Sequence, residues 1–304
     1  MERSVAPVIQ AGRKITEEEL QEICATVEMF PRLDRTELAC TLCEHLEWFT
    51  ASGAPKVDAC RKLLMRMEAQ GMVRLPALVE RMGKKSRGKR KTVEMSERTN
   101  KEAPVNGLLS AYKPISVEPV VDREEIGLWN EYMERYHPLG YKQPFGYRLR
   151  YFVRSGKRIL GCLLLSGAAK SMGVRDKWIG WNDDRRLENL GWVVNNSRFF
   201  VLPWVDLPHL ASHTLGKLSR RVGSDYKELW GFRPLLMETY VDPARYKGTC
   251  YRAAGWLELG KTTGEGLRRM GKTYETTPKL LFVKPLDKDF KRQLCRQNLK
   301  GEAK

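Results

Sequence analysis

The stretch YRLRYFVRSGKRILGCLLL, residues 147–165, contains two runs that are typical of neighbouring β-strands. The first run, Tyr147 to Val153, alternates polar and apolar side chains, as a strand with one buried face does. Gly156-Lys157 then turns the chain into Ile159 to Leu165, an apolar run suited to the centre of a sheet. The stretch therefore predicts two adjacent strands in a largely buried sheet.

Helical and strand patterns alternate around this pair of strands. The expected helices span 124–137, 184–190, 208–222 and 243–254, the further strands span 193–202, 234–241, 256–260 and 279–283, and an amphipathic tail spans 287–297. Alternation of this kind is typical of a sheet covered by helices. The fold class predicted for residues 106–304 is therefore α/β (α+β), with a mixed sheet and flanking helices.

The N-terminal third has the pattern of a small helical module. Thr16 with Glu19, and Asp34 with Glu37, have the spacing of capping boxes, which begin helices. A third helix is expected to begin at Asp58 and to end at Gly71, followed by a short strand, or wing, over residues 72–76.

Basic residues on that third helix, Arg61, Lys62 and Arg66, are predicted to project outward. Three helices and a wing with a basic last helix are the pattern of a winged-helix DNA-binding module, which we predict for residues 1–80. The alternative is a plain three-helix bundle, because charged side chains lie outside in either case.

The composition limits the classes of protein to which the chain can belong. There are 54 Lys plus Arg against 37 Asp plus Glu, a formal net charge of +17, which favours a polyanionic partner such as nucleic acid. No apolar run is long enough to span a bilayer, so no membrane partner is expected. Seven cysteines, an odd number, indicate reduced thiols in the cytoplasm. Cys40, Cys43, His45 and Cys60 lack a second ligand pair, so no metal site is predicted.

Much of the positive charge falls in a few groups. Residues 81–105 are predicted to be a flexible basic linker that contacts phosphates, or alternatively one that only solubilises the chain. The predicted phosphate-binding residues beyond the third helix are Lys84, Lys85, Arg87, Lys89, Arg90, Lys91, Arg198, Lys217, Arg220, Arg221, Arg252, Arg268 and Arg269.

The order of helices and strands after residue 105 resembles the GCN5-related N-acetyltransferase fold. Tyr251-Arg252-Ala253-Ala254-Gly255-Trp256 matches a Tyr that this family places before a Gly and an aromatic residue. The resemblance implies that Tyr251 is a general acid for a departing thiolate. The turn at 207–213 lacks glycine, and Pro208 removes an amide donor, which disfavours acyl-coenzyme A as a cofactor. The alternative role for Tyr251 is a buried residue with a hydrogen-bonded hydroxyl.

Five motifs stand in order along residues 110–290: Tyr136-His137-Pro138-Leu139-Gly140-Tyr141, Asn195-Asn196-Ser197-Arg198-Phe199, His209-Leu210-Ala211-Ser212, Glu238-Thr239-Tyr240-Val241-Asp242-Pro243 and Gly248-Thr249-Cys250-Tyr251-Arg252-Ala253-Ala254. Together they resemble a second family, the DruA-like proteins named for a component of the Druantia anti-phage system. The resemblance implies a nucleic-acid-directed role in defence or in mobile elements.

Four residues in these motifs are candidate catalytic groups. His137 at a helix end is either an acid–base group or a cap. Glu238 and Asp242 are four apart at a strand end, so both can face one side and hold a divalent metal in a nuclease. Tyr251 beside Arg252 can attack a phosphodiester, unless the ring is buried and Arg252 pairs with Glu238.

The sequence thus predicts a cytoplasmic nucleic-acid-binding protein of bacterial anti-phage defence or mobile-element type that contacts DNA with both domains. DNA is the first expected partner and RNA the second. The alternatives are an acyl or aminoacyl transferase, and transposase-like cleavage or strand transfer through Tyr251 or the Glu238/Asp242 pair. No cofactor is predicted except Mg²⁺ in the nuclease case, and oligomeric state and catalysis are left open.

Overall fold

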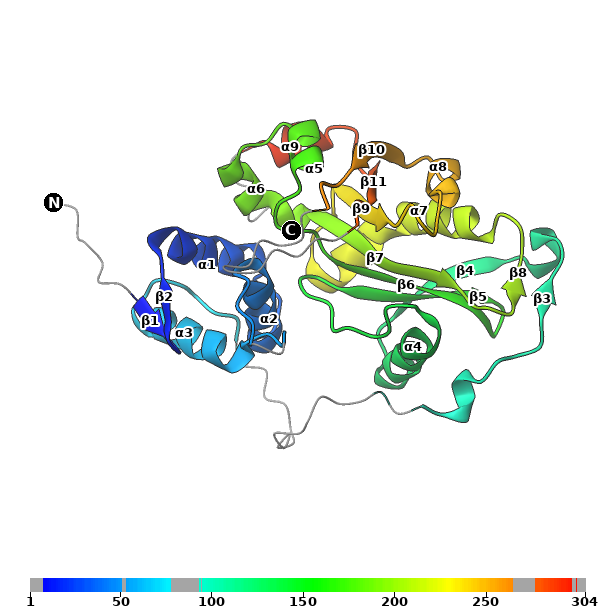
Figure 1. Ribbon diagram of the computed structural model, residues 1–304, viewed down its shortest axis with the longest axis horizontal. Coiled ribbons are helices and arrows are strands. Elements are labelled where there is room, and N and C mark those ends of the chain that lie inside the picture. Colours follow the sequence, from blue (N-terminus) through cyan, green and yellow to red (C-terminus); the bar gives the residue numbers. More distant parts are fainter. Residues whose placement is uncertain are drawn as a thin grey trace.

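The computed structural model describes residues 8–50, 53–77, 93, 95–264, 277–296 and 299. Figure 1 shows a small helical module beside a larger α/β domain. Two basic segments, 78–92 and 265–276, lie outside the described residues. The predicted phosphate-binding residues in those segments are Lys84, Lys85, Arg87, Lys89, Arg90, Lys91, Arg268 and Arg269.

The N-terminal module begins its helices where the capping signals lie. The Thr16 hydroxyl accepts a hydrogen bond from the Glu19 amide at 3.2 Å, and the Glu19 carboxylate accepts one from the Thr16 amide at 3.1 Å. Asp34 and Glu37 form the second capping box, so both predictions are confirmed. The elements of the module are β1 (Val8–Gln10), β2 (Arg13–Ile15), α1 (Glu17–Met29), α2 (Arg35–His45) and α3 (Val57–Ala69).

The strand expected at residues 72–76 is wrong. Side chains satisfy the polar backbone groups there: Leu75 donates its amide to Glu68, and the carbonyl of Pro76 accepts from Arg35. A hairpin before the helices, β1 with β2, is the two-stranded sheet of this module instead. Its two-residue turn, Ala11-Gly12, has positive φ at both positions, as a type I′ turn requires.

The α/β domain contains a seven-stranded mixed sheet in the order β10-β11-β9-β7-β6-β5-β4. In this sheet the β7–β9 pair is parallel and every other neighbouring pair is antiparallel. The predicted fold class, α/β with a mixed sheet and flanking helices, is confirmed. The strands are β4 (Ile115–Val120), β5 (Leu149–Ser155), β6 (Arg158–Gly167), β7 (Val193–Val201), β9 (Leu236–Val241), β10 (Leu257–Lys261) and β11 (Leu280–Pro285), and a separate parallel pair joins β3 (Val105–Asn106) to β8 (Val205–Asp206).

Helices cover both faces of this sheet. Tyr151 and Phe152 are neighbours in β5 and so point to opposite faces. The Tyr151 hydroxyl donates to Asp225 of α7 at 2.8 Å, whereas Phe152 lies edge-on to Tyr132 of α4. The helix expected at 243–254 is shorter than predicted, since a turn occupies its first half. The helices are α4 (Arg123–Tyr136), α5 (Gly173–Ile179), α6 (Asp183–Asn189), α7 (Leu210–Trp230), α8 (Thr249–Ala253) and α9 (Phe290–Leu294).

Strands β7 and β9 pair over only part of their length. Their ladder joins Val193–Asn195 to Leu236–Glu238, and β7 then continues to Val201 without β9. Near the end of the ladder the β6–β7 register shifts, because Leu164 pairs with Arg198 but Leu165 pairs with Asn196. Ser197 is therefore an extra residue, a β-bulge that turns neighbouring side chains to different faces.

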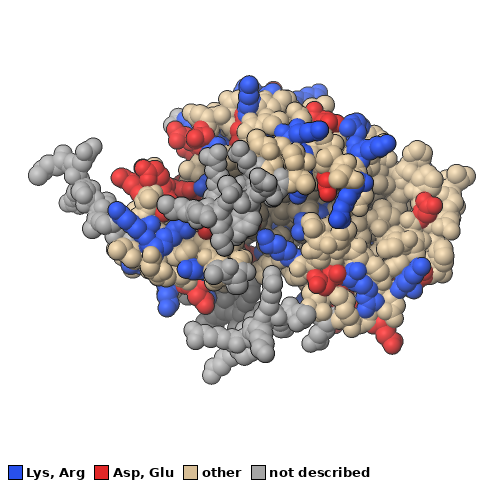
Figure 2. Space-filling model, viewed as in Figure 1, with Lys and Arg blue, Asp and Glu red and all other residues tan. Residues whose placement is uncertain are grey.

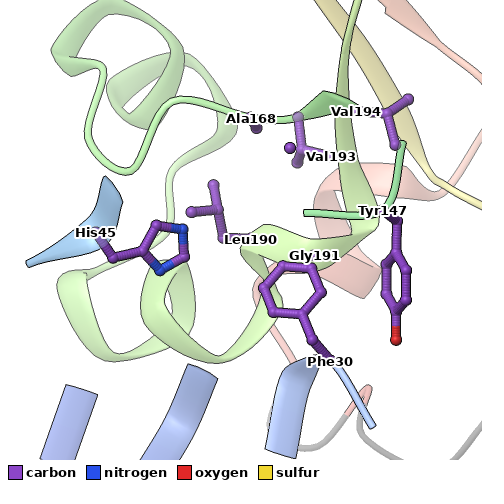
Figure 3. Close-up of a pocket in the computed structure, with 9 residues that line it drawn as sticks. Phe30, His45, Tyr147, Ala168, Leu190, Gly191, Val193 and Val194 are labelled. Carbon is purple, nitrogen blue, oxygen red and sulfur yellow. The ribbon is translucent and has the colours of Figure 1, made fainter. Parts of the chain in front are cut away.

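The N-terminal module packs directly against the α/β domain. Lys170, which follows β6, contacts the Glu22 carboxylate at 2.7 Å and the His45 carbonyl at 3.0 Å. Figure 3 shows Phe30 and His45 of the module facing Tyr147 and the start of β7 across a small cavity. The cavity measures about 10 Å³, roughly the room that one water molecule needs.

The last part of the segment expected to be a flexible linker is attached to α4. Ser96 donates its amide and its hydroxyl to Glu131 of α4, at 3.0 and 2.6 Å. Arg135 of α4 also donates to the Ser96 carbonyl at 3.1 Å. Residues 95–105 therefore follow the surface of the α/β domain, while residues 81–92 of the expected linker lie outside the described part of the chain.

Candidate nucleic-acid interface and the motif residues

Tyr251 of α8 lies in the core, the alternative that the sequence left open. Its side chain is only 8% exposed and its ring stacks on Phe282. The hydroxyl accepts a hydrogen bond from the Asn196 side-chain amide at 3.2 Å and lies 3.5 Å from the Thr239 hydroxyl. Burial raises the pKa of the phenol, which is therefore neutral at pH 7.

The Tyr251 hydroxyl lies where strands β7 and β9 stop pairing. Asn196 directly follows the last β7 residue that pairs with β9, and Thr239 directly follows the last β9 residue of that ladder. Tyr251 therefore lies at the point where the two strands part. A neutral phenol at such a point can donate or accept a hydrogen bond, but a buried hydroxyl is poorly placed to attack DNA.

Arg252 does not pair with Glu238, so the alternative expectation of that ion pair is wrong. Arg252 is exposed and its guanidinium binds the Glu258 carboxylate of β10, with Nε to Oε2 at 3.0 Å. It also donates to the Lys247 carbonyl and lies over the Phe282 ring. Arg252 therefore joins α8 to the loop before it and to the neighbouring edge strand.

Glu238 is paired instead with Arg175 of α5, and both side chains are fully buried. Arg175 Nη1 lies 2.9 Å from Glu238 Oε2, while Oε1 accepts hydrogen bonds from the Ala169 amide and the Tyr240 hydroxyl, each at 3.0 Å. Arg175 also donates a hydrogen bond from its Nε to Oδ1 of Asp176 at 2.8 Å. This network leaves the Glu238 carboxylate with partners on both oxygens.

Asp242 has different surroundings from Glu238, so the two carboxylates do not form the expected pair. Asp242 follows β9, and its carboxylate accepts the Ala244 amide at 3.0 Å. Within the described ranges no group of three His, Cys, Asp or Glu side chains could hold a metal ion. The spacing of four was therefore insufficient to bring the carboxylates to one site.

His137 ends α4 and caps the turn that follows. Its Nδ1 accepts a hydrogen bond from the Leu139 amide at 3.1 Å, and its ring lies edge-on to Phe200 of β7. Burial, together with the nearby charge of Arg198, lowers the pKa of His137 to about 4. The imidazole is therefore neutral at pH 7. Arg198 itself is half-buried and donates to the Ser197 carbonyl of the bulge at 2.7 Å.

The predicted nucleic-acid-binding residues of α3 lie on its outer side. Lys62 is exposed and Arg61 is half-buried. Arg66 reaches the Ile9 carbonyl of the β1–β2 hairpin, with both terminal nitrogens at 3.4 Å. The hairpin is therefore held beside the basic face of α3.

The predicted basic residues of α7 divide into two groups. Arg221 is engaged inside the protein, where it forms an ion pair with Asp225 at 2.8 Å and donates to the Val117 carbonyl. Lys217 is half-buried and Arg220 is exposed, and neither forms an ion pair with a described carboxylate. Only Lys217 and Arg220 are thus available to a ligand.

These two side chains belong to a cationic surface that we call the α7 patch, formed by Lys113, His213, Lys217 and Arg220. Burial lowers the pKa of His213, and the charges of Lys217, Lys113 and Arg220 lower it further. Lys113 comes from the chain before β4, so two distant segments supply the charge. Of the patch residues on the 21-residue helix α7, His213 lies in its first turn, where the positive end of the helix adds to the surface.

A family model described as "Druantia protein DruA" matches residues 66–280, more than half of the chain. The chain belongs to the DruA family. The match includes all five motifs singled out in the sequence. It also includes the end of α3, so the DruA-type region begins inside the helical module and not at the α/β domain.

A curated member of the DruA family is similar over part of this chain. It is "Druantia protein DruA" of Escherichia coli (strain UMEA 4076-1), 30% identical over 130 residues. That alignment covers 39% of this chain and 31% of the E. coli protein. The aligned region is thus about a third of the length of the relative.

Solved structures similar to this DruA-family chain include acetyltransferases. An aminoglycoside acetyltransferase in complex with coenzyme A and kanamycin is 12% identical, with a TM-score of 0.37, over 59% of this chain and 98% of that one. A putative acetyltransferase from T. thermophilus is also 12% identical, with a TM-score of 0.33, over 64% of this chain and 96% of that one.

Three residues that matter in the structure were missed in the sequence: Arg175 in the core, and Lys113 and Tyr246 at the surface. Arg175 was missed because a single Arg in a polar stretch usually lies at the surface. Lys113 was missed because only the fold brings it to α7. Tyr246 had a usable signal, since Arg245 and Lys247 flank it in the segment between two of the DruA motifs. An aromatic side chain between two cations is a pattern found in nucleic-acid contacts.

Proposed function

We propose that this DruA-family chain is a DNA-binding component of bacterial anti-phage defence and that it contacts DNA with both of its domains. The α7 patch is the observation that carries the proposal. Its cations come from two segments, meet around His213 near the start of α7 and along its next two turns, and have no described acidic partners. The name of the related E. coli protein, a Druantia component, supports the defence context.

The α7 patch has the chemistry that a phosphate backbone requires. Lys and Arg side chains neutralise phosphates and release counterions. His213 is a neutral donor at pH 7, because its pKa lies below its ordinary value. The patch therefore provides affinity without sequence preference, as phosphate contacts do.

The second contact is the outer face of α3. Helix α1 packs against α6, and Thr41 of α2 accepts the Gly146 amide at 3.0 Å, so these two helices face the α/β domain. In Figure 1, α3 and the hairpin lie on the far side of the module. Figure 2 shows Lys and Arg side chains on both parts of the molecule in that view. Among the described residues, the α/β domain does not cover the basic face of α3, which in this proposal enters a groove of DNA.

A salt-dependent binding measurement tests this function. A labelled DNA duplex is titrated with the full chain by fluorescence anisotropy, for the wild type and for Lys217→Ala/Arg220→Ala. We expect roughly tenfold weaker binding by the variant, and a plot of log K against log salt that is about two units shallower, since two phosphate contacts are lost.

The control variant is Lys177→Ala/Lys288→Ala, which removes two exposed cations from α5 and from the turn before α9, outside α7. Its net charge equals that of the first variant, so a long-range effect of charge alone would weaken both equally. Equal losses would contradict a contact at the α7 patch. An affinity that does not change with salt would contradict phosphate binding altogether.

A further inference from the structure

Tyr246 has an unusual degree of exposure for an aromatic residue. Its side chain is 61% exposed, and it is the single aromatic among the strongly exposed large hydrophobic side chains of the described chain. It lies in the turn between β9 and α8, residues 242–248. Isolated exposed aliphatic residues are ordinary, but an exposed aromatic ring has more apolar area to lose from water on binding.

The turn that carries Tyr246 is held at both ends. Its first residue, Asp242, accepts the Ala244 amide on its carboxylate and the Tyr246 amide on its carbonyl, at 3.0 and 2.9 Å. At the other end, Arg252 donates to the Lys247 carbonyl. The backbone under Tyr246 is therefore fixed, which lowers the entropy lost when a ligand contacts the ring.

The two sequence neighbours of Tyr246 in the turn are both cations. Arg245 and Lys247 are exposed on either side of Tyr246, and Arg245 reaches the nearest carboxylate, Asp242, only at 3.8 Å. A ring between two cations is poorly suited to an apolar protein partner, which would have to desolvate both charges. It suits a ligand that offers a flat aromatic surface between two anionic groups.

We propose that Tyr246 is a stacking platform for an unpaired base of single-stranded DNA, with Arg245 and Lys247 holding the phosphates on either side. Stacking on an aromatic side chain accepts any base, because every base has a π-face, and the cations follow the backbone. Paired bases in a duplex expose only their edges, so the platform selects unpaired DNA. The inference rests on the proposed DNA-binding function and adds that this turn binds single-stranded DNA.

An abasic strand separates stacking from phosphate binding. Binding of labelled oligothymidylate, and of a strand of equal length with abasic sites, is measured for wild type, Tyr246→Ala and Tyr246→Phe. We expect Tyr246→Ala to weaken binding of oligothymidylate about tenfold. The same substitution should change binding of the abasic strand, and of duplex DNA, less than twofold. Tyr246→Phe keeps the ring and should bind like the wild type.

Two more variants complete the test. Leu108→Ala removes another strongly exposed side chain, and we expect it to leave all three affinities unchanged. In Tyr246→Trp, oligothymidylate should quench the tryptophan emission by stacking, whereas the abasic strand should not. If wild type binds DNA but Tyr246→Ala binds oligothymidylate equally well, the platform is wrong and the proposed function stands. If wild type binds no DNA, both are wrong.

Discussion

At the scale of single residues, burial distinguishes side chains that look alike in the sequence. Glu238 and Asp242 are both carboxylates of one motif, yet Glu238 is fully buried against Arg175 and Asp242 caps a surface turn. A buried ion pair is not strongly stabilising overall, but removing one partner leaves the other charge unpaired inside the protein. Glu238 therefore matters for stability, and Asp242 for the shape of the turn that carries Tyr246.

Substitution of the two carboxylates should separate these roles. Glu238→Gln leaves Arg175 with Asp176 as its remaining carboxylate partner and replaces one buried acceptor oxygen with a donor, so we expect it to lower the free energy of unfolding by about 2–3 kcal/mol. Asp242→Asn keeps a side-chain oxygen that can accept the Ala244 amide, so we expect a loss below about 1 kcal/mol. Urea unfolding followed by circular dichroism measures both. Equal losses in the two variants would contradict the assignment.

At the scale of elements, the capping motifs located the starts of α1 and α2. Sequence patterns failed where contacts with distant residues decide the backbone conformation. The capping boxes at Thr16 and Asp34 were predicted correctly because a cap involves residues only three apart. The strand expected at 72–76 is absent because Glu68 and Arg35 satisfy the polar groups of that segment. Helix α8 is short because the turn fixed by Asp242 occupies the residues before it.

The capping box of α1 provides a test at this scale. Thr16→Ala removes the hydroxyl that accepts the Glu19 amide, so we expect the free energy of unfolding to fall by about 1 kcal/mol. Thr36→Ala changes an exposed threonine inside the first turn of α2, where the side chain caps nothing, and serves as the control. Thermal unfolding measures both. If Thr36→Ala lowers the free energy of unfolding as much as Thr16→Ala does, the cap is not the cause of the loss.

At the scale of the whole molecule, the N-terminal module and the α/β domain share a buried interface. His45 of α2 is 4% exposed, lies against Phe145 of the α/β domain and contacts the Thr26 hydroxyl with its Nδ1 at 3.3 Å. Burial, assisted by the charge of Lys170, lowers the pKa of His45 to about 3. The two parts therefore depend on a neutral histidine between them.

This interface predicts a dependence of stability on pH. In the unfolded chain His45 takes up a proton below about pH 6.5, whereas in the folded protein it stays neutral down to about pH 3. The unfolded state thus binds more protons in this window, and stability falls as pH falls, by up to about 1.4 kcal/mol per pH unit. Urea unfolding at several pH values, for wild type and His45→Gln, measures how the free energy of unfolding depends on pH.

His45→Gln should make the fall in stability between pH 6.5 and pH 3 shallower by the equivalent of one proton. Glu22 at the same interface has a raised pKa because of its burial, which acts in the opposite direction, and it is present in both proteins. The difference between wild type and variant therefore isolates His45. Identical slopes would show that His45 is already protonated in the folded protein.

The sequence by itself determined what depends on neighbours along the chain: the capped helix starts, the apolar central strands and the family resemblance that the family model confirms. The tertiary structure decided which side chains meet. It buried Tyr251 and Glu238, joined Lys113 to α7 and left Tyr246 exposed. The physical reason is that spacing along a chain fixes local hydrogen bonds, whereas burial and the pairing of charges depend on packing between distant segments.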